Sequence, residues 1–331
     1  MSPDPALVTL DDLCAAAAGL VGVAVHTPLL PARWAGQLWL KPENLQPIGA
    51  FKIRGAHHKL ATLGESERAR GVVTHSSGNH AQAVALAARL FGVKAVVVMP
   101  DVASPAKIEA TRALGAEVVL VPPERRLAAA EELAARHGYA MVPPYDDPAI
   151  IAGQGTVGLE IVDDALAANL DLAAVLVPVG GGGLISGVAA AVKLRRPQVR
   201  VIGVEPELAA DARDSVRRGE RVSWPVEQVY RTAADGLRSP SVGELPWRHI
   251  SAYVDDMVAV SEQEISDAVR ALALRSRLVA EPSGAVTTAA HLFHGAELPD
   301  GPRVAVISGG NIAPAALAAL LSDPAGRQSG S

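Results

Sequence analysis

The stretch that decides the fold is Ala174-Val175-Leu176-Val177-Pro178-Val179-Gly180-Gly181-Gly182-Gly183-Leu184-Ile185-Ser186-Gly187. It begins with a short, continuous apolar run at residues 174–178, which predicts a parallel strand buried on both faces of a sheet. An Ala-rich stretch at residues 184–194 follows the glycines and predicts a helix. A buried strand, a loop of small residues and a helix together indicate a βαβ unit of an open α/β sheet.

The same alternation of short apolar runs and Ala-rich stretches continues through most of the chain. Runs rich in β-branched residues, ended by Gly, Pro or Ser clusters, predict further strands at residues 72–74, 95–99, 117–121, 199–204 and 303–307. Helices are expected between them, at residues 79–91, 107–114 and 262–276. We therefore predict an α/β protein with two open, mostly parallel sheets flanked by helices, one from residues 71–142 and one from residue 170 onward.

The composition excludes several classes of protein. The 331 residues are 49% apolar and 20% charged, with a net charge of −5 and no dense run of Lys or Arg, so we expect neither nucleic acid nor an anionic membrane as a partner. The single cysteine, Cys14, excludes an internal disulfide and favours a reducing, cytoplasmic location. The N-terminus lacks the order of a signal peptide, and Gly or Pro interrupts every long apolar stretch, so no membrane span is expected.

Small polar residues gather where three predicted strands end, in the loops 75–80, 179–183 and 308–311. Ligands of open α/β sheets bind at the carboxyl ends of strands, beside helix N-termini, so we expect the three loops to share one cleft. Four consecutive glycines, from Gly180 to Gly183, exceed what a tight turn requires. Their N–H groups and the following helix N-terminus predict a phosphate-binding site.

The glycine loop also resembles a dinucleotide-binding fingerprint. Gly181-x-Gly183-x-x-Ser186 nearly matches this motif, and Glu205 stands where a ribose-binding acid is expected, about 20 residues further on. Against this interpretation, Ser186 replaces the usual Gly or Ala, and Lys52 and the loop 76–80 are left without a role. An NAD-dependent oxidoreductase is therefore kept as a distant alternative.

Lys52 is a candidate nucleophile because of its neighbours. It follows the turn Pro47-Ile48-Gly49 and stands beside Phe51, whose ring offers an apolar wall that would desolvate an amine. Desolvation lowers the pKa of a lysine and makes the neutral amine available for a Schiff base.

Two further loops offer hydrogen-bonding groups to a ligand. In Ser76-Ser77-Gly78-Asn79-His80, two hydroxyls and the free N–H groups of a helix start can hold a carboxylate, and the Asn79 amide can reach a phenolic oxygen. Ser77 or Asn79 would also serve as a helix N-cap, and the two roles are compatible. After the last strand, the neutral hydroxyl of Ser308 can bond a pyridine nitrogen without protonating it, or can cap a helix.

These segments together resemble the fold-type II pyridoxal-phosphate (PLP) enzymes of the serine/threonine dehydratase and serine racemase family. The resemblance extends from Thr27-Pro28-Leu29 to Ser308-Gly309-Gly310-Asn311 and covers nearly the whole chain. Its matching segments are Phe51-Lys52-Ile53-Arg54-Gly55, Ser76 to His80, Ala152-Gly153-Gln154-Gly155-Thr156, Gly180 to Gly183, Ala234-Asp235-Gly236-Leu237 and Glu281-Pro282-Ser283-Gly284. Their number, order and spacing carry the resemblance, which implies a fold like that of the tryptophan synthase β chain.

The resemblance also implies roles for single residues. Lys52 would form the Schiff base with PLP and then act as the general base, with Phe51 beside the cofactor. The glycines Gly180, Gly181, Gly182 and Gly183 would hold the phosphate, Asn79 the ring hydroxyl and Ser308 the pyridine nitrogen. The substrate carboxylate would be bound by Ser76, Ser77, Gly78, Asn79 and His80. Ser77 matches the acid/base residue of the racemases, so it is a second catalytic candidate.

A metal site and an assembly are implied in the same way. Glu205, the carbonyl of Ala209 and Asp211 match a divalent-cation site of this family and supply hard oxygen ligands suited to Mg²⁺ or Ca²⁺. We expect residues 1–65 and 146–321 to form a large PLP-binding domain, residues 70–143 a small domain and residues 322–331 a flexible tail. Relatives imply a homodimer.

The implied reaction is the dehydration and deamination of L-threonine, L-serine or both to a 2-oxo acid and ammonia. Two departures from the family pattern weaken the choice of substrate: Ala50 replaces a frequent Ser, and Ala81 a frequent Gly. The chain ends without the regulatory domain of feedback-inhibited biosynthetic enzymes, which favours a catabolic or standalone role. Serine racemase and 3-hydroxyaspartate dehydratase are alternatives, the second because Arg126 falls near a position that contacts acidic substrates, although a solvated arginine is the simpler interpretation.

Overall fold

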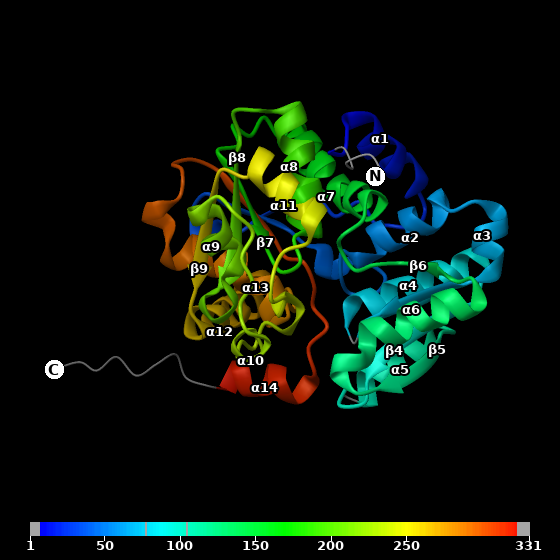
Figure 1. Ribbon diagram of the computed structural model, residues 1–331. Coiled ribbons are helices and arrows are strands. Elements are labelled where there is room, and N and C mark those ends of the chain that lie inside the picture. The colour runs from blue at the N-terminus through cyan, green and yellow to red at the C-terminus, as the bar shows by residue number, and fades with distance from the viewer. Residues whose placement is uncertain (1–6, 77, 104, 323–331) are drawn as a thin grey trace.

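The computed structural model describes residues 7–76, 78–103 and 105–322, and these residues form two sheets surrounded by helices (Figure 1). The larger sheet has six strands in the order β1-β2-β10-β7-β8-β9, and the smaller has four in the order β5-β4-β3-β6. Every strand pair is parallel except β1 with β2. The fold prediction of two open, mostly parallel sheets flanked by helices is confirmed.

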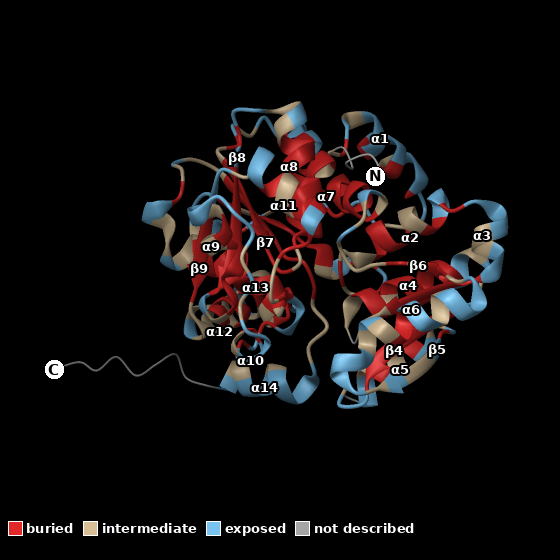
Figure 2. Cartoon of the chain, in the orientation of Figure 1, coloured by how far each residue is buried: buried red, intermediate tan, exposed pale blue. Residues whose placement is uncertain are grey.

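The strands are short and built from apolar runs, as expected for sheets covered on both faces. Those of the large sheet are β1 (Leu30–Pro31), β2 (Leu38–Lys41), β7 (Ala174–Pro178), β8 (Arg200–Pro206), β9 (Asp256–Val260) and β10 (Arg303–Val306). Those of the small sheet are β3 (Val72–His75), β4 (Ala95–Pro100), β5 (Glu117–Val121) and β6 (Ala140–Met141). Every residue of β4, β7 and β10 is buried, and Figure 2 shows the central strands as the buried interior of both sheets.

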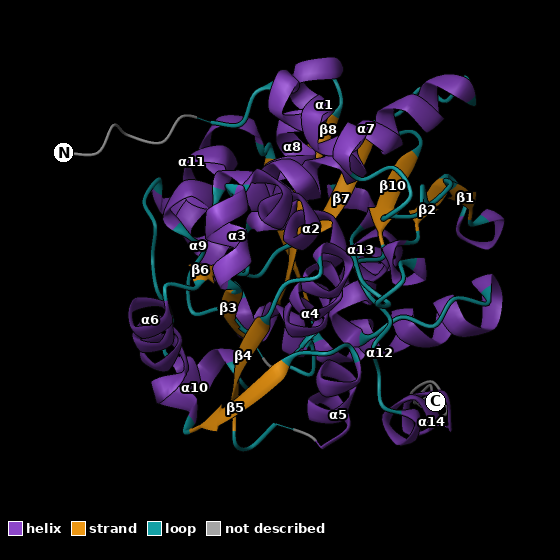
Figure 3. Ribbon diagram, turned by 90° about the vertical axis from the view of Figure 1, so that its right-hand side faces the viewer, coloured by secondary structure: helices purple, strands orange, loops and turns teal. Residues whose placement is uncertain are grey.

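Helices cover both faces of the large sheet. One face packs on α7 (Pro148–Ala167), α8 (Gly183–Arg195) and α11 (Glu244–Tyr253), and the other on α12 (Glu262–Ala271) and α13 (Pro282–Phe293). The remaining helices of this part of the chain are α1 (Leu10–Gly19), α9 (Asp211–Arg218), α10 (Val226–Val229) and α14 (Pro314–Ser322). Figure 3 shows the strands enclosed between these helices.

The small sheet has its own helices, which are α3 (Glu65–Arg70), α4 (Asn79–Phe91), α5 (Pro105–Ala113) and α6 (Arg126–His137). Helix α2 (Lys52–Thr62) joins the two parts, because its buried side chains pack with α4 while its backbone approaches α7. Within the described ranges, no helix is long and apolar enough to cross a membrane.

The structure corrects several details of the sequence prediction. The strands β1, β2, β6 and β9 were not predicted, because two of them have only two residues and β2 ends in a lysine. The helix expected at residues 262–276 ends as an α-helix at Ala271 and continues as a π-helical turn over Leu272–Ser276. Ser322, expected in a flexible tail, is the last residue of α14; the rest of that tail lies outside the described residues.

Helices α7 and α8 cross closely because glycines stand at their contact. A Cβ atom on Gly187 would lie 2.3 Å from the carbonyl oxygen of Ile151 and 2.4 Å from the nitrogen of Gly155. The two backbones therefore touch at this point. This contact fixes α8, and the glycine loop before it, against the rest of the large sheet.

Candidate active site

Lys52 is the first residue of α2, where two segments of the large sheet meet. The N–H of Phe51 donates to the carbonyl of Ser308 at 3.1 Å, which ties the start of the helix to the loop after β10. The Lys52 ammonium donates to the carbonyl of Pro144 at 2.8 Å and lies 5.1 Å from the centre of the Phe51 ring. Burial lowers the pKa of Lys52 to about 8. A substantial fraction of this amine is therefore neutral at mildly alkaline pH, as a nucleophile or general base requires.

An ionic cluster behind Lys52 holds α2 in place. Arg54 is buried and donates to both carboxylate oxygens of Glu43, at 2.7 and 2.8 Å, and to both of Glu160, at 2.6 and 2.9 Å. Lys41 is also buried and donates to Glu160 at 2.5 Å. Sequence analysis gave these residues no role, because the partners of Arg54 lie 11 and 106 positions away along the chain.

The loop after β3 faces the same region. The N–H of Gly78 donates to the Ser76 hydroxyl at 3.3 Å, while Ser77, a catalytic and substrate-binding candidate, lies outside the described residues. His80 is buried, and its Nε2 donates to the carbonyl of Val142 at 3.0 Å. Burial, followed by the charge of Lys52, lowers the pKa of His80 to about 3, so this imidazole is neutral. It therefore adds no charge close to the Lys52 amine.

Asn79 does not cap its helix. It is the first residue of α4, Gly78 occupies the N-cap position, and no side-chain capping bond forms there. The Asn79 amide instead donates to Glu281 at 2.7 Å and accepts from Asn311 at 2.8 Å. The capping interpretation of Asn79 is therefore wrong. The residue links the small sheet to two loops of the large one.

The glycine loop lies between β7 and α8, with Gly183 as the first helical residue. Gly182 has a positive φ of 90°, which glycine adopts without strain. A Cβ on Gly181 would lie 2.1 Å from the ring of Tyr145, and one on Gly180 would lie 3.0 Å from Leu237. Only glycines fit at these positions. The N-terminus of α8, which has no side-chain cap, leaves N–H groups available for an anion.

Ser308 follows the last strand and is buried. Its hydroxyl lies 3.5 Å from the carbonyl of Ser283, at the limit of a hydrogen bond. Its neighbour Gly309 forms an isolated bridge with Ala50, two residues before Lys52. The Ser308 loop and the Lys52 turn are therefore paired through their backbones.

These positions fit pyridoxal phosphate. A neutral-capable amine, an uncapped helix start behind a glycine cradle, and the neutral groups of Asn79 and Ser308 are the donors and acceptors that its aldehyde, phosphate and ring require. They come from separate segments of both sheets, which the hydrogen bonds of Asn79 and Phe51 hold together.

The expected metal ligands lie at a different place, where β8 meets α9. The buried carboxylate of Glu205 accepts the N–H groups of Ala212 at 3.0 Å and Arg213 at 2.7 Å. Oxygen Oδ2 of Asp211 is buried and has no hydrogen-bond partner among the described residues. Burial and the proximity of Asp211 raise the pKa of Glu205 well above its ordinary value, and burial raises the pKa of Asp211 to about 7. Two buried acids with an unpaired oxygen are consistent with a cation ligand set completed by a backbone carbonyl.

The described ranges hold no cluster of three or more His, Cys, Asp or Glu side chains arranged for a metal ion. The Glu205–Asp211 pair is therefore not a metal centre built from side chains alone, and the carbonyl of buried Ala209 is the additional ligand that the sequence predicted.

Arg126, the candidate for acidic substrates, begins α6. It donates to the carbonyl of Pro123 at 2.9 Å and to the Tyr230 hydroxyl at 3.3 Å, so it connects the small sheet to the α10 segment. Burial and, second, the charge of Arg126 lower the pKa of His75, which places the guanidinium near the end of β3.

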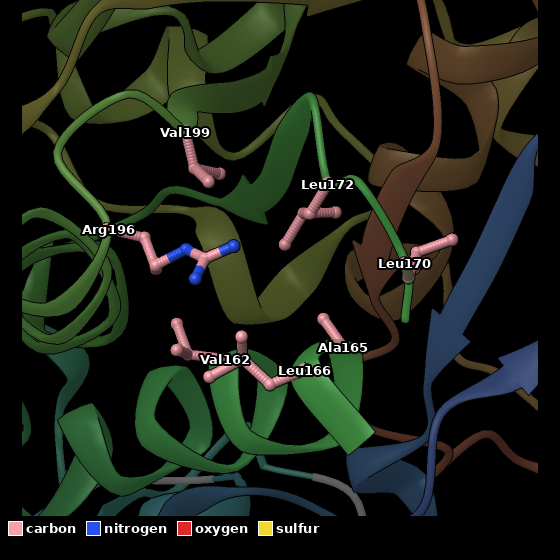
Figure 4. Close-up of a pocket in the computed structure, with 7 residues that line it drawn as sticks. All are labelled: Val162, Ala165, Leu166, Leu170, Leu172, Arg196 and Val199. Atoms are coloured by element: carbon pink, nitrogen blue, oxygen red, sulfur yellow. The ribbon is translucent and has the colours of Figure 1, made fainter. Parts of the chain in front are cut away.

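A small apolar hollow lies away from these loops, at the end of α7 (Figure 4). It is lined by Val162, Ala165, Leu166, Leu170, Leu172, Arg196 and Val199. It contains no nucleophile or acid and contributes nothing to the site described above.

The fold and the lysine–glycine site define a cofactor-dependent enzyme, and comparison with known proteins gives its class. Residues 23–310 match the family of pyridoxal-phosphate dependent enzymes, and the chain belongs to this family. The predictions of the family, of PLP as cofactor and of an enzyme are confirmed. This family assignment favours a PLP phosphate site at the glycine loop over the dinucleotide alternative.

Individual relatives are similar over most of the chain. The L-threonine ammonia-lyase of Thermotoga maritima is 46% identical over 92% of this chain and 76% of its own length. The L-threo-3-hydroxyaspartate ammonia-lyase of Saccharomyces cerevisiae is 40% identical over 89% of this chain and 91% of its own.

Solved structures agree with these relatives. A bacterial-type threonine deaminase, from the source abbreviated T.th., has a TM-score of 0.87 at 44% identity and covers 92% of this chain and 99% of its own. The serine racemase of Dictyostelium discoideum has a TM-score of 0.85 at 36% identity, over 93% of this chain and 100% of its own.

Proposed function

We propose that this enzyme is an L-threonine and L-serine ammonia-lyase, which converts a hydroxy amino acid to a 2-oxo acid and ammonia. The observation that carries the proposal is the Lys52 amine, whose pKa burial lowers to about 8, at the junction of the glycine, Asn79 and Ser308 loops. Threonine ammonia-lyase and threonine deaminase are the names of similar proteins.

In this proposal the cofactor is held by the chain's own groups. Lys52 bonds its aldehyde carbon, Gly180 to Gly183 and the start of α8 bind its phosphate, Asn79 its ring hydroxyl and Ser308 its ring nitrogen. When bound, PLP withdraws electrons from the substrate Cα and so acidifies the Cα–H bond.

The neutral Lys52 amine then removes the Cα proton as general base. The Cβ–oxygen bond breaks, the hydroxyl leaves with a proton as water, and the released enamine hydrolyses to the 2-oxo acid and ammonia. The loop from Ser76 to His80 binds the substrate carboxylate through its N–H groups. Because Ser308 is neutral, it does not protonate the ring nitrogen, which favours elimination over prolonged charge storage on the ring.

Replacement of Lys52 tests the proposal. Lys52→Ala is expected to abolish 2-oxobutanoate formation from L-threonine and to abolish the borohydride-sensitive visible band of the protein with PLP. Lys59→Ala is the matched control, because Lys59 lies on the same helix and pairs with Asp147 at 2.6 Å. Normal turnover by Lys52→Ala would refute the assignment.

A second candidate substrate is 3-hydroxyaspartate, and the position of Arg126 near His75 favours it. A guanidinium binds a second carboxylate through two parallel hydrogen bonds. Arg126→Ala is then expected to lose turnover of 3-hydroxyaspartate while keeping that of threonine, whereas Arg125→Ala, which removes a neighbour paired with Glu132, leaves both unchanged. Equal effects on both substrates would exclude this role. Serine racemisation is the remaining alternative, supported by the racemase neighbour, and depends on Ser77; D-serine formation from L-serine measures it.

A divalent cation, Mg²⁺ or Ca²⁺, is proposed at Glu205, Asp211 and the Ala209 carbonyl. The buried, unpaired Oδ2 of Asp211 supports it. We expect each ion to raise the melting temperature of the protein, and Asp211→Asn to remove that effect. A melting temperature insensitive to both ions would contradict the site.

The division into a large domain (1–65 and 146–321) and a small domain (70–143), a homodimeric assembly and a cytoplasmic location belong to the same proposal. Limited proteolysis that yields fragments cut near residues 65–70 and 143–146 would support the division. Light scattering of the purified protein measures its mass against the 34.1 kDa chain.

A further inference from the structure

Three polar side chains from distant parts of the sequence form a continuous chain beside Ser308. Asn79 begins α4, Glu281 precedes α13, and Asn311 follows β10. The Asn311 amide nitrogen donates to the Asn79 side-chain oxygen at 2.8 Å, and the Asn79 amide nitrogen donates to Glu281 at 2.7 Å. Sequence reasoning placed Glu281 in a family motif but gave neither Glu281 nor Asn311 a task.

The direction of every hydrogen bond in this chain is determined at one end. The carbonyl of Ile48, which can only accept, is bonded by the same Asn311 nitrogen at 2.8 Å. This nitrogen has two hydrogens, so its second hydrogen must find an acceptor, and that acceptor is the Asn79 oxygen. The nitrogen of Asn79 must then face Glu281. A backbone carbonyl therefore sets the orientation of the Asn79 amide through Asn311, whatever the protonation state of Glu281.

The surrounding backbone leaves no room for another arrangement. A Cβ on Gly309 would lie 2.4 Å from the Glu281 carboxylate and 3.1 Å from the Asn79 nitrogen. A Cβ on Gly49, which has a positive φ of 71°, would lie 2.5 Å from the side-chain oxygen of Asn311. In addition, the N–H of Glu281 donates to the carbonyl of Gly309 at 3.1 Å. The three side chains are thus packed against the two glycines that adjoin the Ser308 and Lys52 turns.

We propose that Glu281 and Asn311 are positioning residues that hold the Asn79 amide with its oxygen engaged and one of its two N–H groups engaged, so that its remaining N–H is the group offered to the ring hydroxyl of the cofactor. The inference rests on the proposed contact of Asn79 with the cofactor. Without the two partners, the amide could rotate and present its oxygen, which cannot donate a hydrogen bond.

Glu281 also carries a charge that changes near neutral pH. It is 4% exposed. Burial and, second, the charge of Asp235 raise the pKa of Glu281 to about 7, against the opposing effects of Asn79, Lys107 and the Asn311 N–H. An ionised carboxylate accepts the Asn79 hydrogen bond more strongly than a neutral one. A spectral change of the bound cofactor near pH 7 that depends on Glu281 is therefore expected.

The test is a titration of the apoprotein with PLP, in which the visible absorption gives the dissociation constant. Asn79→Ala removes the donor and is expected to weaken PLP binding about tenfold, the usual effect of one hydrogen bond of about 1.4 kcal/mol. Glu281→Leu and Asn311→Asp should weaken it to a similar degree. Glu281→Gln keeps an acceptor oxygen for Asn79, so its affinity should remain within about threefold of the parent while the spectral change near pH 7 disappears.

A double-mutant cycle separates positioning from a general loss of structure. In the Asn79→Ala background, Glu281→Leu should cause no further loss of PLP affinity, because the amide that it orients is already gone. Additive losses would overturn the inference and leave the role of Asn79 intact. An Asn79→Ala protein with unchanged affinity would instead refute the proposed cofactor contact itself.

Two further measurements keep the result interpretable. Glu297→Gln removes a charge paired with His294 at the surface and is expected to leave PLP affinity and spectrum unchanged. Circular dichroism of each apoprotein verifies folding. If Glu281→Leu does not fold, the isosteric Asn311→Asp still decides, because unchanged PLP affinity in that variant would overturn the inference.

Discussion

Replacing Arg54 by methionine should destabilise the protein strongly and in a pH-dependent way. Arg54 is 1% exposed and Glu43 is fully buried, and the guanidinium donates to both carboxylate oxygens of this acid. Methionine fills part of the space but leaves Glu43 without its main counter-charge. Removal of one partner of a buried ion pair costs about 3–5 kcal/mol, so we expect a loss of this size in the free energy of unfolding at pH 8.

The pH dependence follows from the two states of Glu43. In the parent protein burial opposes ionisation, but Arg54 outweighs it and the pKa of Glu43 is lowered. Its contribution to stability is therefore present above the unfolded pKa and is lost as the pH falls below it. In the variant, unopposed burial raises the pKa of Glu43, so the neutral acid is tolerated at low pH and stability falls as the pH rises. Both effects make the difference between the proteins larger at pH 8 than at pH 5, by about 1.4 kcal/mol for each unit of pKa change.

The assay is urea unfolding followed by tryptophan fluorescence at pH 5 and pH 8. Arg112→Met is the matched control, because Arg112 pairs with Glu109 at 2.8 Å on an exposed face of α5; such pairs contribute up to about 1 kcal/mol. The reasoning would be refuted if Arg54→Met lost less than about 1 kcal/mol at pH 8, or if its deficit grew on acidification.

Three other outcomes are expected. Gly187→Ala places a Cβ 2.3 Å from the Ile151 carbonyl and should cost about 1–3 kcal/mol in urea unfolding; Gly64→Ala, with open space around it, serves as control, and equal stability of the two variants would contradict the close helix contact. The rate at which the apoprotein captures PLP should rise with pH about a midpoint near 8, because the attacking Lys52 amine must be neutral; a midpoint near the ordinary lysine value would show that burial does not lower its pKa. Gly182→Ala forces a side chain into a φ of 90° and should lower stability by about 1–2 kcal/mol as well as PLP affinity, and unchanged affinity for PLP would argue against a phosphate site at this loop.

Much of the fold could be predicted because its signals are local. The apolar run at 174–178 and the glycines after it specify a strand, a turn and a helix within 22 residues, Ala174–Arg195, and the structure has β7 and α8 there. The same is true of β3, β4 and β5. The motif around Lys52 was equally readable, since the residues that identify it are neighbours in sequence.

What the sequence left open depends on contacts between distant segments. Strand β2 ends in Lys41, a residue that by itself argues for solvent, and it is buried only because Glu160, 119 positions later, accepts a hydrogen bond from its ammonium. Whether Asn79 caps a helix or bonds Glu281 could not be decided locally, because Glu281 is 202 positions away.

The sequence alone therefore determined the order of elements, the family and the loops that carry the chemistry, because hydrophobic periodicity and glycine clusters act over a few residues. Only the tertiary structure decided the burial that lowers the pKa of Lys52, the partners that orient Asn79 and the counter-charges of Arg54. These properties depend on which atoms surround a group in space, and packing of the two sheets around α2 brings those atoms together from positions up to 232 residues apart.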